Sequence, residues 1–411
     1  MSPRFIRFLI VAILLIPLWS FLAWAFRPVR PINIFILDKT VPENFCPEHR
    51  SFNWILTHLK FAKPDRKMYK IKKDYWGFFP VERGGDYNVF DLDSIVSATV
   101  DSSTVSSTGI ASFNKISKAN LTYQEIDSLS NELDMVYYTD MYGIYFNEWF
   151  RDTLLWKERS SEIYGGMTKK ELYLLQRMKA QRKLILTEFN YYHHPTNRDI
   201  RYEAGKVINA KWTGWVGRYF DPLDPVENKE LPMWVYTNYL KQHGGVWPFI
   251  KGGIVFARED DWIEILEDST HLNVIIPYIY TGEYGQRKFK MIDKVHYPFW
   301  FDISLPSNDS NTIVSTFRIE ANEKGDSILN LFNIPSEFPA VMESTGPSPY
   351  YYFGADFSDN QIKTRSAYFA GTGLLSFTFY NDDISERSKF FYRLYRPMMK
   401  KIMNDYYRTL K

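Results

Sequence analysis

Cysteine is almost absent from this chain of 411 residues, since Cys46 is the single one. One cysteine excludes a disulfide bond within the chain and any metal site built from several cysteines. Basic residues are not in excess either: 50 Lys and Arg stand against 48 Asp and Glu, the net charge is +2, and no long basic stripe occurs. We therefore expect no nucleic-acid partner.

Familiar catalytic motifs are missing as well. The sequence contains no Walker phosphate-binding loop, no Gly-x-Ser-x-Gly turn and no His-Glu-x-x-His pair. No motif therefore assigns the chain to an enzyme class, whether it is an enzyme stays open, and we predict no cofactor.

Apolar residues are plentiful: 45% of the chain is hydrophobic and 18% is aromatic. The longest uncharged run, residues 8–26, would span roughly 28 Å as a helix, close to the thickness of a bilayer core. We predict that residues 1–30 form an N-terminal anchor, with one transmembrane helix through residues 8–26 and a cytoplasmic N-terminus. The rest would lie outside a bacterial inner (plasma) membrane. The alternative is a secreted protein, because Ala23-Trp24-Ala25 has the form of a signal-peptide cleavage site.

Residues 31–411 are predicted to form one extracytoplasmic α/β domain with insertions at about 90–120 and 290–335. Capping boxes at Thr122-x-x-Glu125 and Thr168-x-x-Glu171 predict helices that precede apolar strands. Such alternation favours a mostly parallel, doubly wound sheet that is covered on both faces.

The later part of the chain has a different pattern, and from about residue 295 we expect antiparallel strands. These are residues 299–303, 313–319 and 374–379. Before them, residues 253–256 favour a strand, 262–266 a helix and 274–279 another strand.

The run from Asp134-Met135-Val136-Tyr137 through the second capped helix to Arg182-Lys183-Leu184-Ile185-Leu186 resembles the core of the class I glutamine amidotransferase-like superfamily. It is most similar to noncatalytic branches, such as the trimerisation domain of some bacterial β-galactosidases. The segment Phe338-Pro339-Ala340-Val341 to Tyr350-Tyr351-Tyr352-Phe353-Gly354 is similar to the strand pair that closes the sheet in these domains.

Catalytic members of that superfamily carry cysteine in a Gly-x-Cys-x-Gly turn, whereas Cys46 here lies in Asn44-Phe45-Cys46-Pro47. The resemblance therefore implies the fold without glutamine hydrolysis. The chain also resembles uncharacterised membrane-anchored bacterial proteins that share Asp38-Lys39-Thr40-Val41-Pro42 and Glu48-His49-Arg50.

Acidic residues follow several predicted strands. Asp38, Asp140 and Glu188 stand at strand ends, and Glu48 follows the first strand. Because the carboxyl ends of parallel strands meet at one edge, these candidate catalytic groups would share that edge and act as general acid and base, or hold a divalent cation. The alternative is that each caps a helix or pairs with an arginine.

Aromatic and polar residues near the same edge are candidates for ligand binding, because indole and phenol rings suit the apolar faces of sugars. They are His49, Asn190, Trp212, Trp215, Arg218 and Tyr219. The alternative is that the aromatic residues only bury area. We predict no metal site, since the neighbouring His193 and His194 point in different directions on an extended chain and would not bind one metal together. The alternative is a metal-dependent enzyme that uses His49 or His193 with Glu188.

Two further groups of charged residues have alternative interpretations. Asp356 and Asp359 either join the acidic edge or form a turn. The basic C-terminal helix, residues 390–407, either lies against anionic lipid headgroups or presents a solvated face.

Together these observations predict a noncatalytic binding or assembly protein of the bacterial envelope, related to carbohydrate, with an envelope glycan or a membrane protein as partner. The alternative is a glycan-directed hydrolase that uses the carboxylates at the strand ends. The two differ in whether Asp38, Glu48, Asp140 and Glu188 share one pocket.

Overall fold

The computed structural model describes residues 12, 14–43, 46–93, 95–98, 120–150, 160–374, 376–378, 383–385 and 387–411. The Ser- and Thr-rich run at 101–108, within the predicted insertion at 90–120, lies outside these residues. The described strands form two larger sheets, of 11 and of 4 strands, and two small two-stranded sheets.

The larger sheet is mixed. Its strands, in spatial order, are β15 (Lys294–His296), β14 (Tyr278–Thr281), β17 (Asn311–Arg318), β18 (Glu337–Ser344), β19 (Tyr350–Phe353), β10 (Leu184–Thr187), β7 (Met135–Tyr138), β2 (Ile34–Asp38), β4 (Trp76–Pro80), β5 (Tyr87–Phe90) and β6 (Ile95–Ala98). The four pairings from β19 to β4 are parallel. The other six pairings are antiparallel.

The prediction of a mostly parallel, doubly wound sheet is therefore wrong. Helix-then-strand alternation marks only the central strands, because there each parallel neighbour needs a crossover helix. The outer strands pair antiparallel with partners that the local sequence pattern does not identify, such as β14 with β17 across residues 278–318.

The smaller sheet has the order β13 (Ile263–Glu267), β12 (Gly253–Arg258), β11 (Ala210–Phe220) and β16 (Phe301–Pro306), all antiparallel. Two minor pairs complete the set: β1 (Arg30–Pro31) with β3 (Phe61–Ala62), and β8 (Ile144–Tyr145) with β9 (Glu162–Tyr164). The predicted insertion at 290–335 contains β15, β16, β17 and α10 (Glu323–Leu331), so its strands belong to both larger sheets.

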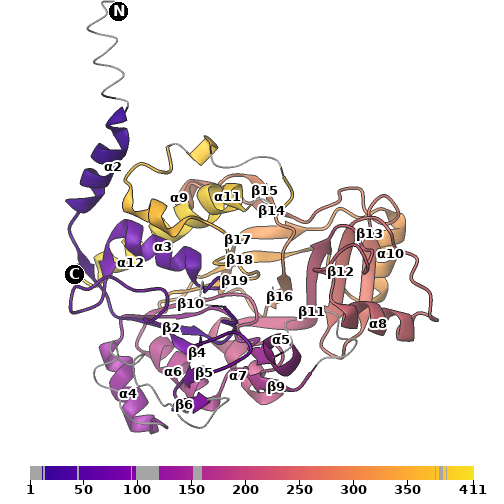
Figure 1. The fold of residues 1–411 in the computed structure, drawn as a ribbon, viewed down its shortest axis with the longest axis horizontal. Coiled ribbons are helices and arrows are strands. Elements are labelled where there is room, and N and C mark those ends of the chain that lie inside the picture. Colours follow the sequence, from indigo (N-terminus) through magenta and orange to yellow (C-terminus); the bar gives the residue numbers. More distant parts are fainter. Residues whose placement is uncertain are drawn as a thin grey trace, which may run out of the picture.

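Helices cover both faces of the larger sheet (Figure 1). Ile34 and Ile36 of β2 share one core with α3 (Arg50–Leu59) and α12 (Arg396–Thr409). The alternate residues Phe35 and Leu37 share the other core with α4 (Tyr123–Glu132) and α6 (Lys169–Ala180). This alternation follows from the two-residue period of a strand, and it buries β2 on both faces.

The remaining helices are short. They are α5 (Phe146–Phe150), α7 (Arg198–Val207), α8 (Met233–Gln242), α9 (Glu283–Phe289), α11 (Ser388–Phe390), the 3-10 turns at Thr364–Tyr368 and Ser376–Thr378, and a π-helical turn at Phe391–Tyr395 that leads into α12. Figure 1 places α8 and α10 beside the smaller sheet, away from α3 and α12.

The N-terminal anchor prediction is not supported. Residues 1–11 and 13 lie outside the described residues, and the described helix, α2 (Ile16–Ala25), has 10 residues. Among the residues that the structure describes, no helix combines the length and apolarity needed to cross a membrane. The predicted transmembrane helix is therefore not seen. One side of α2 contacts the globule, where the Trp24 and Tyr368 rings lie 4.8 Å apart and Ser20 accepts from the amide of Ala370.

Some of the predicted local elements are present in the structure and others are not. Both capping boxes are present, at the starts of α4 and α6. The predicted helix at 262–266 is wrong, because those residues belong to strand β13, which forms a hairpin with β12. Residues 375 and 379 of the predicted strand at 374–379 lie outside the described residues, and for Ser376–Thr378 the prediction is wrong, because they form a 3-10 turn.

Candidate functional site

A pocket of about 380 Å³ lies beyond the carboxyl ends of the central parallel strands. Thr40 follows β2, Asp140 follows β7, Asn190 follows β10 and Asp356 follows β19. The opposite side comes from the smaller sheet and from the chain around α8. This position matches the rule that ligands of sheets with parallel strands bind outside the carboxyl ends of the strands.

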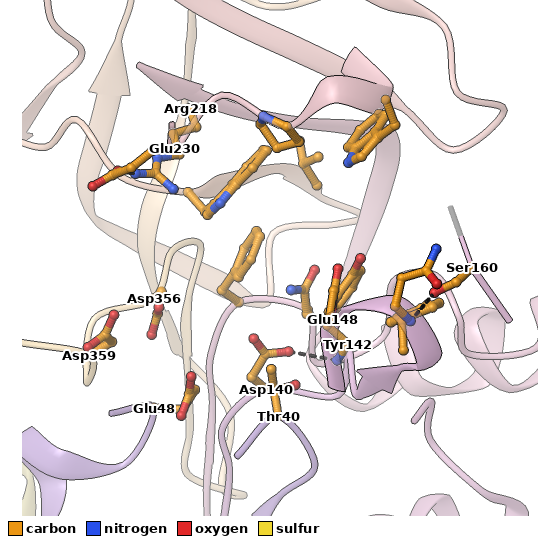
Figure 2. A pocket seen from close by; sticks show the side chains of 18 residues that line it. Thr40, Glu48, Asp140, Tyr142, Glu148, Ser160, Arg218, Glu230, Asp356 and Asp359 are labelled. Atoms are coloured by element: carbon orange, nitrogen blue, oxygen red, sulfur yellow. Dashed lines mark hydrogen bonds and ion pairs between the residues drawn. The ribbon is translucent and has the colours of Figure 1, made fainter. Parts of the chain in front are cut away.

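Acidic side chains dominate the lining. The pocket is lined by one arginine and six carboxylic acids, which are Glu48, Asp140, Glu148, Glu230, Asp356 and Asp359. In Figure 2, Glu48, Asp140, Asp356 and Asp359 lie on one side, and Arg218 with Glu230 lies on the other. We call this cavity the acidic pocket.

Glu48 comes from the turn that precedes α3, and its Oε2 atom is buried without a hydrogen-bond partner. Burial raises the pKa of Glu48 well above its ordinary value, and the negative charges of Asp38, Asp359, Asp356 and Asp140 raise it further. The protonated form of Glu48 is therefore favoured more than that of an exposed carboxyl group, and its Oε2 atom has no hydrogen-bond partner within the described structure.

Asp140 is held at the end of β7 by its own turn, because the amide of Tyr142 donates to Oδ1 at 2.6 Å. Burial raises the pKa of Asp140 to about 7, and the charge of Asp38 adds to this, while hydrogen bonds with Tyr142, Thr40 and Asn190 oppose it. Both protonation states of Asp140 are therefore populated near neutral pH, as a general base or acid requires.

The other two carboxylic acids follow β19 and differ in their partners. Asp359 forms an ion pair with Arg387 at 2.9 Å. Burial raises the pKa of Asp356 well above its ordinary value, and the charge of Asp359 raises it further. The edge thus holds carboxyl groups in different environments, one paired with an arginine and one whose pKa is raised by burial, and such differences are a common basis for acid–base catalysis.

Aromatic side chains form much of the remaining wall. Phe189, Trp234 and Trp300 line the pocket together with Tyr142 and Tyr145, whose rings lie 4.8 Å apart. The Arg218 guanidinium lies 5.9 Å from the centre of the Trp300 ring, and Arg218 also pairs with Glu230. Flat apolar rings among carboxylic acids and an amide are chemically suited to a sugar.

Comparison with known proteins identifies no family. No family model matches the chain, and no curated protein matches it. Among solved structures, a ThuA-like protein from Bacteroides uniformis is similar at a TM-score of 0.33 and 8% identity, over 84% of this chain and 90% of that one.

A likeness at this TM-score carries no argument about the fold, so the predicted resemblance to the amidotransferase-like superfamily stays a prediction. A likeness this weak says nothing about ligand or activity, and the finer resemblance to β-galactosidase trimerisation domains stays a prediction.

Of the four predicted catalytic residues, two line the acidic pocket and two lie behind it. Glu48 and Asp140 line the pocket. Asp38 lies behind them, fully buried, with its Oδ2 at 2.5 Å from His49 Nδ1. Glu188 is buried too, and accepts from the hydroxyl of Tyr137 at 2.5 Å and the amide of Ser358 at 3.0 Å. Burial raises the pKa of Glu188 to about 8.

The predicted ligand-binding residues are divided as well. Asn190 and Arg218 line the acidic pocket. His49 faces the interior, where its Nε2 lies 2.8 Å from the carbonyl of Ile71. Trp215 and Tyr219 are buried in the core, 2% and 5% exposed.

Trp212 stacks on His193 at 4.4 Å, outside the acidic pocket. Burial lowers the pKa of His193 well below its ordinary value. In the part of the chain that the structure describes, no three metal-ligating side chains gather as a metal site would require.

The pocket contains residues that the sequence analysis did not select. Trp234 opens α8 and Trp300 immediately precedes β16, so both come from the side of the smaller sheet. Only the packing of that sheet against the strand ends brings them to the site, and no local pattern in the sequence marks it.

Proposed function

We propose that the protein binds a carbohydrate in the acidic pocket and hydrolyses a glycosidic bond there. The observation that carries this proposal is that Glu48 and Asp140, two carboxylic acids with raised pKa, line one aromatic-walled cavity. Glycoside hydrolases generally use such a pair, one as acid and the other as base or nucleophile.

The groups would have separate roles. Glu48, whose raised pKa favours the protonated form, donates its proton to the leaving glycosidic oxygen as the bond to the anomeric carbon breaks. Asp140 in its ionised form accepts a proton from the water whose oxygen bonds to that carbon. Trp300 and Trp234 would hold the apolar face of the sugar, while Asn190 and Arg218 bind its hydroxyl groups.

Hydrolysis is tested with a panel of p-nitrophenyl glycosides of glucose, galactose, mannose and N-acetylglucosamine, measured from pH 5 to 9. We expect release of p-nitrophenol to rise with pH through about 7, as Asp140 ionises, and to fall again as Glu48 loses its proton. Glu48→Gln should lower the rate about a hundredfold or more. The matched control Glu203→Gln alters an exposed carboxylate on α7 that pairs with Lys206, and it should leave the rate unchanged.

Noncatalytic binding of an envelope glycan is the second candidate. It is favoured because Glu48 and Asp140 line the pocket whereas Asp38 and Glu188, which the hydrolase was expected to share with them, lie behind it. The ion pairs of Asp359 with Arg387 and of Glu230 with Arg218 also fix part of the lining. Wild-type protein that binds oligosaccharides in calorimetry but releases no product from them would favour this second function. Absence of both binding and release would reject both.

The extracytoplasmic location stays a prediction from the sequence. It fits an envelope glycan as ligand. Fractionation of cells that produce the full chain, with immunodetection of each fraction, tests it, and recovery in the cytoplasm alone would contradict it.

A further inference from the structure

A second cavity, of about 570 Å³, lies near the N-terminal helix and shares no lining residue with the acidic pocket. Its walls come from the chain after α2, the end of α3, the loop at 371–374 and one side of α12. The four cationic side chains in its lining are Arg27, Arg30, Arg396 and Lys400, and no carboxylic acid lines it. We call it the basic pocket.

Among the residues that the structure describes, no carboxylate pairs with the cations of the basic pocket. Arg27 donates to the carbonyl of His58 at 3.1 Å, and Arg30 donates to the side-chain oxygen of Asn404. The Nε atom of Arg396 is buried without an acceptor. Within the described ranges none of the four cations forms an ion pair, although acidic partners are found elsewhere on α12, such as Asp405 for Lys401.

The cations of the basic pocket repel one another, and this repulsion shifts their pKa values. Burial lowers the pKa of Lys400, and the positive charges of Arg396 and Arg27 lower it further. Burial likewise lowers the pKa of His58 to about 4, with the charge of Arg396 as the next cause. A bound anion would replace this repulsion with attraction, whereas water only weakens it.

Backbone geometry holds one of the guanidinium groups in place. A Cβ atom added to Gly373 would lie 2.1 Å from Nη1 of Arg396, so the loop backbone passes directly against this side chain. On the other side, Lys60 donates to the carbonyls of Ala25 and Arg27 and fixes the chain that carries Arg27. The cations are thus gathered by packing from segments far apart in sequence.

We propose that the basic pocket binds a phosphate-bearing anion. Arginine forks and a lysine around a cavity match the oxygen geometry and the charge of a phosphate group. This chemistry has two sources, a free phosphate compound or the headgroup of an anionic lipid. The second is relevant because α2 and the residue after it expose large apolar side chains, with Trp19 60% and Phe26 84% exposed.

The test uses the full chain and two probes. Inorganic pyrophosphate is titrated by calorimetry, and sedimentation measures binding to vesicles of phosphatidylcholine with or without phosphatidylglycerol. Arg396→Gln and Lys400→Gln should each weaken binding about tenfold, because each removes one charge-assisted contact. Binding should also weaken as salt is raised. The matched control is Lys401→Gln on the same helix, since Lys401 pairs with Asp405 and does not line the pocket.

The outcomes separate the two sources. Binding of pyrophosphate that depends on Arg396 and Lys400 supports the proposal with a soluble ligand. Binding only to vesicles with phosphatidylglycerol, with the same dependence, supports it with a lipid headgroup. The proposal is overturned if wild-type protein binds neither probe, or if all three variants bind as the wild type does. Lys400 is exposed, so Lys400→Gln keeps the test valid even if Arg396→Gln fails to fold.

Discussion

The buried carboxyl group of Asp140 should lower the free energy of unfolding at high pH, and this effect can be measured directly. Burial is the main reason that its pKa rises from 3.8 to about 7. The folded protein therefore binds more protons than the unfolded chain between about pH 4 and 7, and its free energy of unfolding falls as pH rises through that window. At about 1.36 kcal/mol per pKa unit, the difference between 3.8 and about 7 sets an upper limit of about 4 kcal/mol.

Asp140→Asn removes the charge and keeps an oxygen that accepts from the amide of Tyr142. We expect the variant to be more stable than the wild type at pH 8, by about 1–3 kcal/mol once relaxation around the buried charge is allowed for. Near pH 4, where wild-type Asp140 is largely protonated, the two proteins should differ little. The same variant should lose hydrolytic activity, because groups that serve a functional site often lower the stability of the fold.

Urea unfolding followed by tryptophan fluorescence at pH 4, 5, 6, 7 and 8 gives the two stability curves. Glu203→Gln, on the surface of α7, is the control and should change stability by less than about 1 kcal/mol at every pH. A difference between wild type and Asp140→Asn that stays constant from pH 4 to 8 would refute the reasoning. Lower stability of the variant at pH 8 would refute it as well.

Three further outcomes are expected. Lys39 and Glu171 form an ion pair at 2.8 Å with both side chains 0% exposed. Lys39→Met should therefore lower the free energy of unfolding in urea by about 3–5 kcal/mol, because it leaves a buried carboxylate unpaired. The double variant Lys39→Met with Glu171→Leu should recover much of this lost stability. Trp300→Ala should weaken oligosaccharide binding about tenfold in calorimetry, whereas Trp19→Ala, outside the acidic pocket, should not. Thr168→Ala removes the capping box of α6 and should cost about 1 kcal/mol in thermal unfolding, and an unchanged melting temperature would contradict this.

Features of the fold that depend on neighbouring residues could be predicted from the sequence. The capping boxes at Thr122 and Thr168 are local, since side chain and backbone three residues apart satisfy each other. The hairpin of β12 and β13 was missed, because a five-residue apolar run does not distinguish a short helix from a strand. Residues 263–267 form a strand because they pair with β12, and the sequence of the segment alone does not identify that partner.

The candidate site could be predicted in part for a related reason. The edge where β2, β7 and β10 end follows from the chain direction of parallel strands, and Glu48 and Asp140 were selected on that basis. Whether a strand-end carboxylate faces the cavity or the interior depends on side-chain packing. Asp38 and Glu188 therefore lie behind the pocket, satisfied by His49 and Tyr137. The smaller sheet, which supplies the opposite wall, was not predicted as a separate unit.

The acidic pocket brings together parts of the chain that are far apart along it. Glu48 stands near the beginning, Asp140 and Arg218 in the middle, and Asp356 near the end. A fragment that begins after Glu48 or ends before Asp356 loses part of the lining, so a ligand in the cavity would have to release before such a segment detaches. Occupancy should therefore protect the whole molecule from proteolysis at once, and partial digestion should abolish binding wherever the first cut separates these segments.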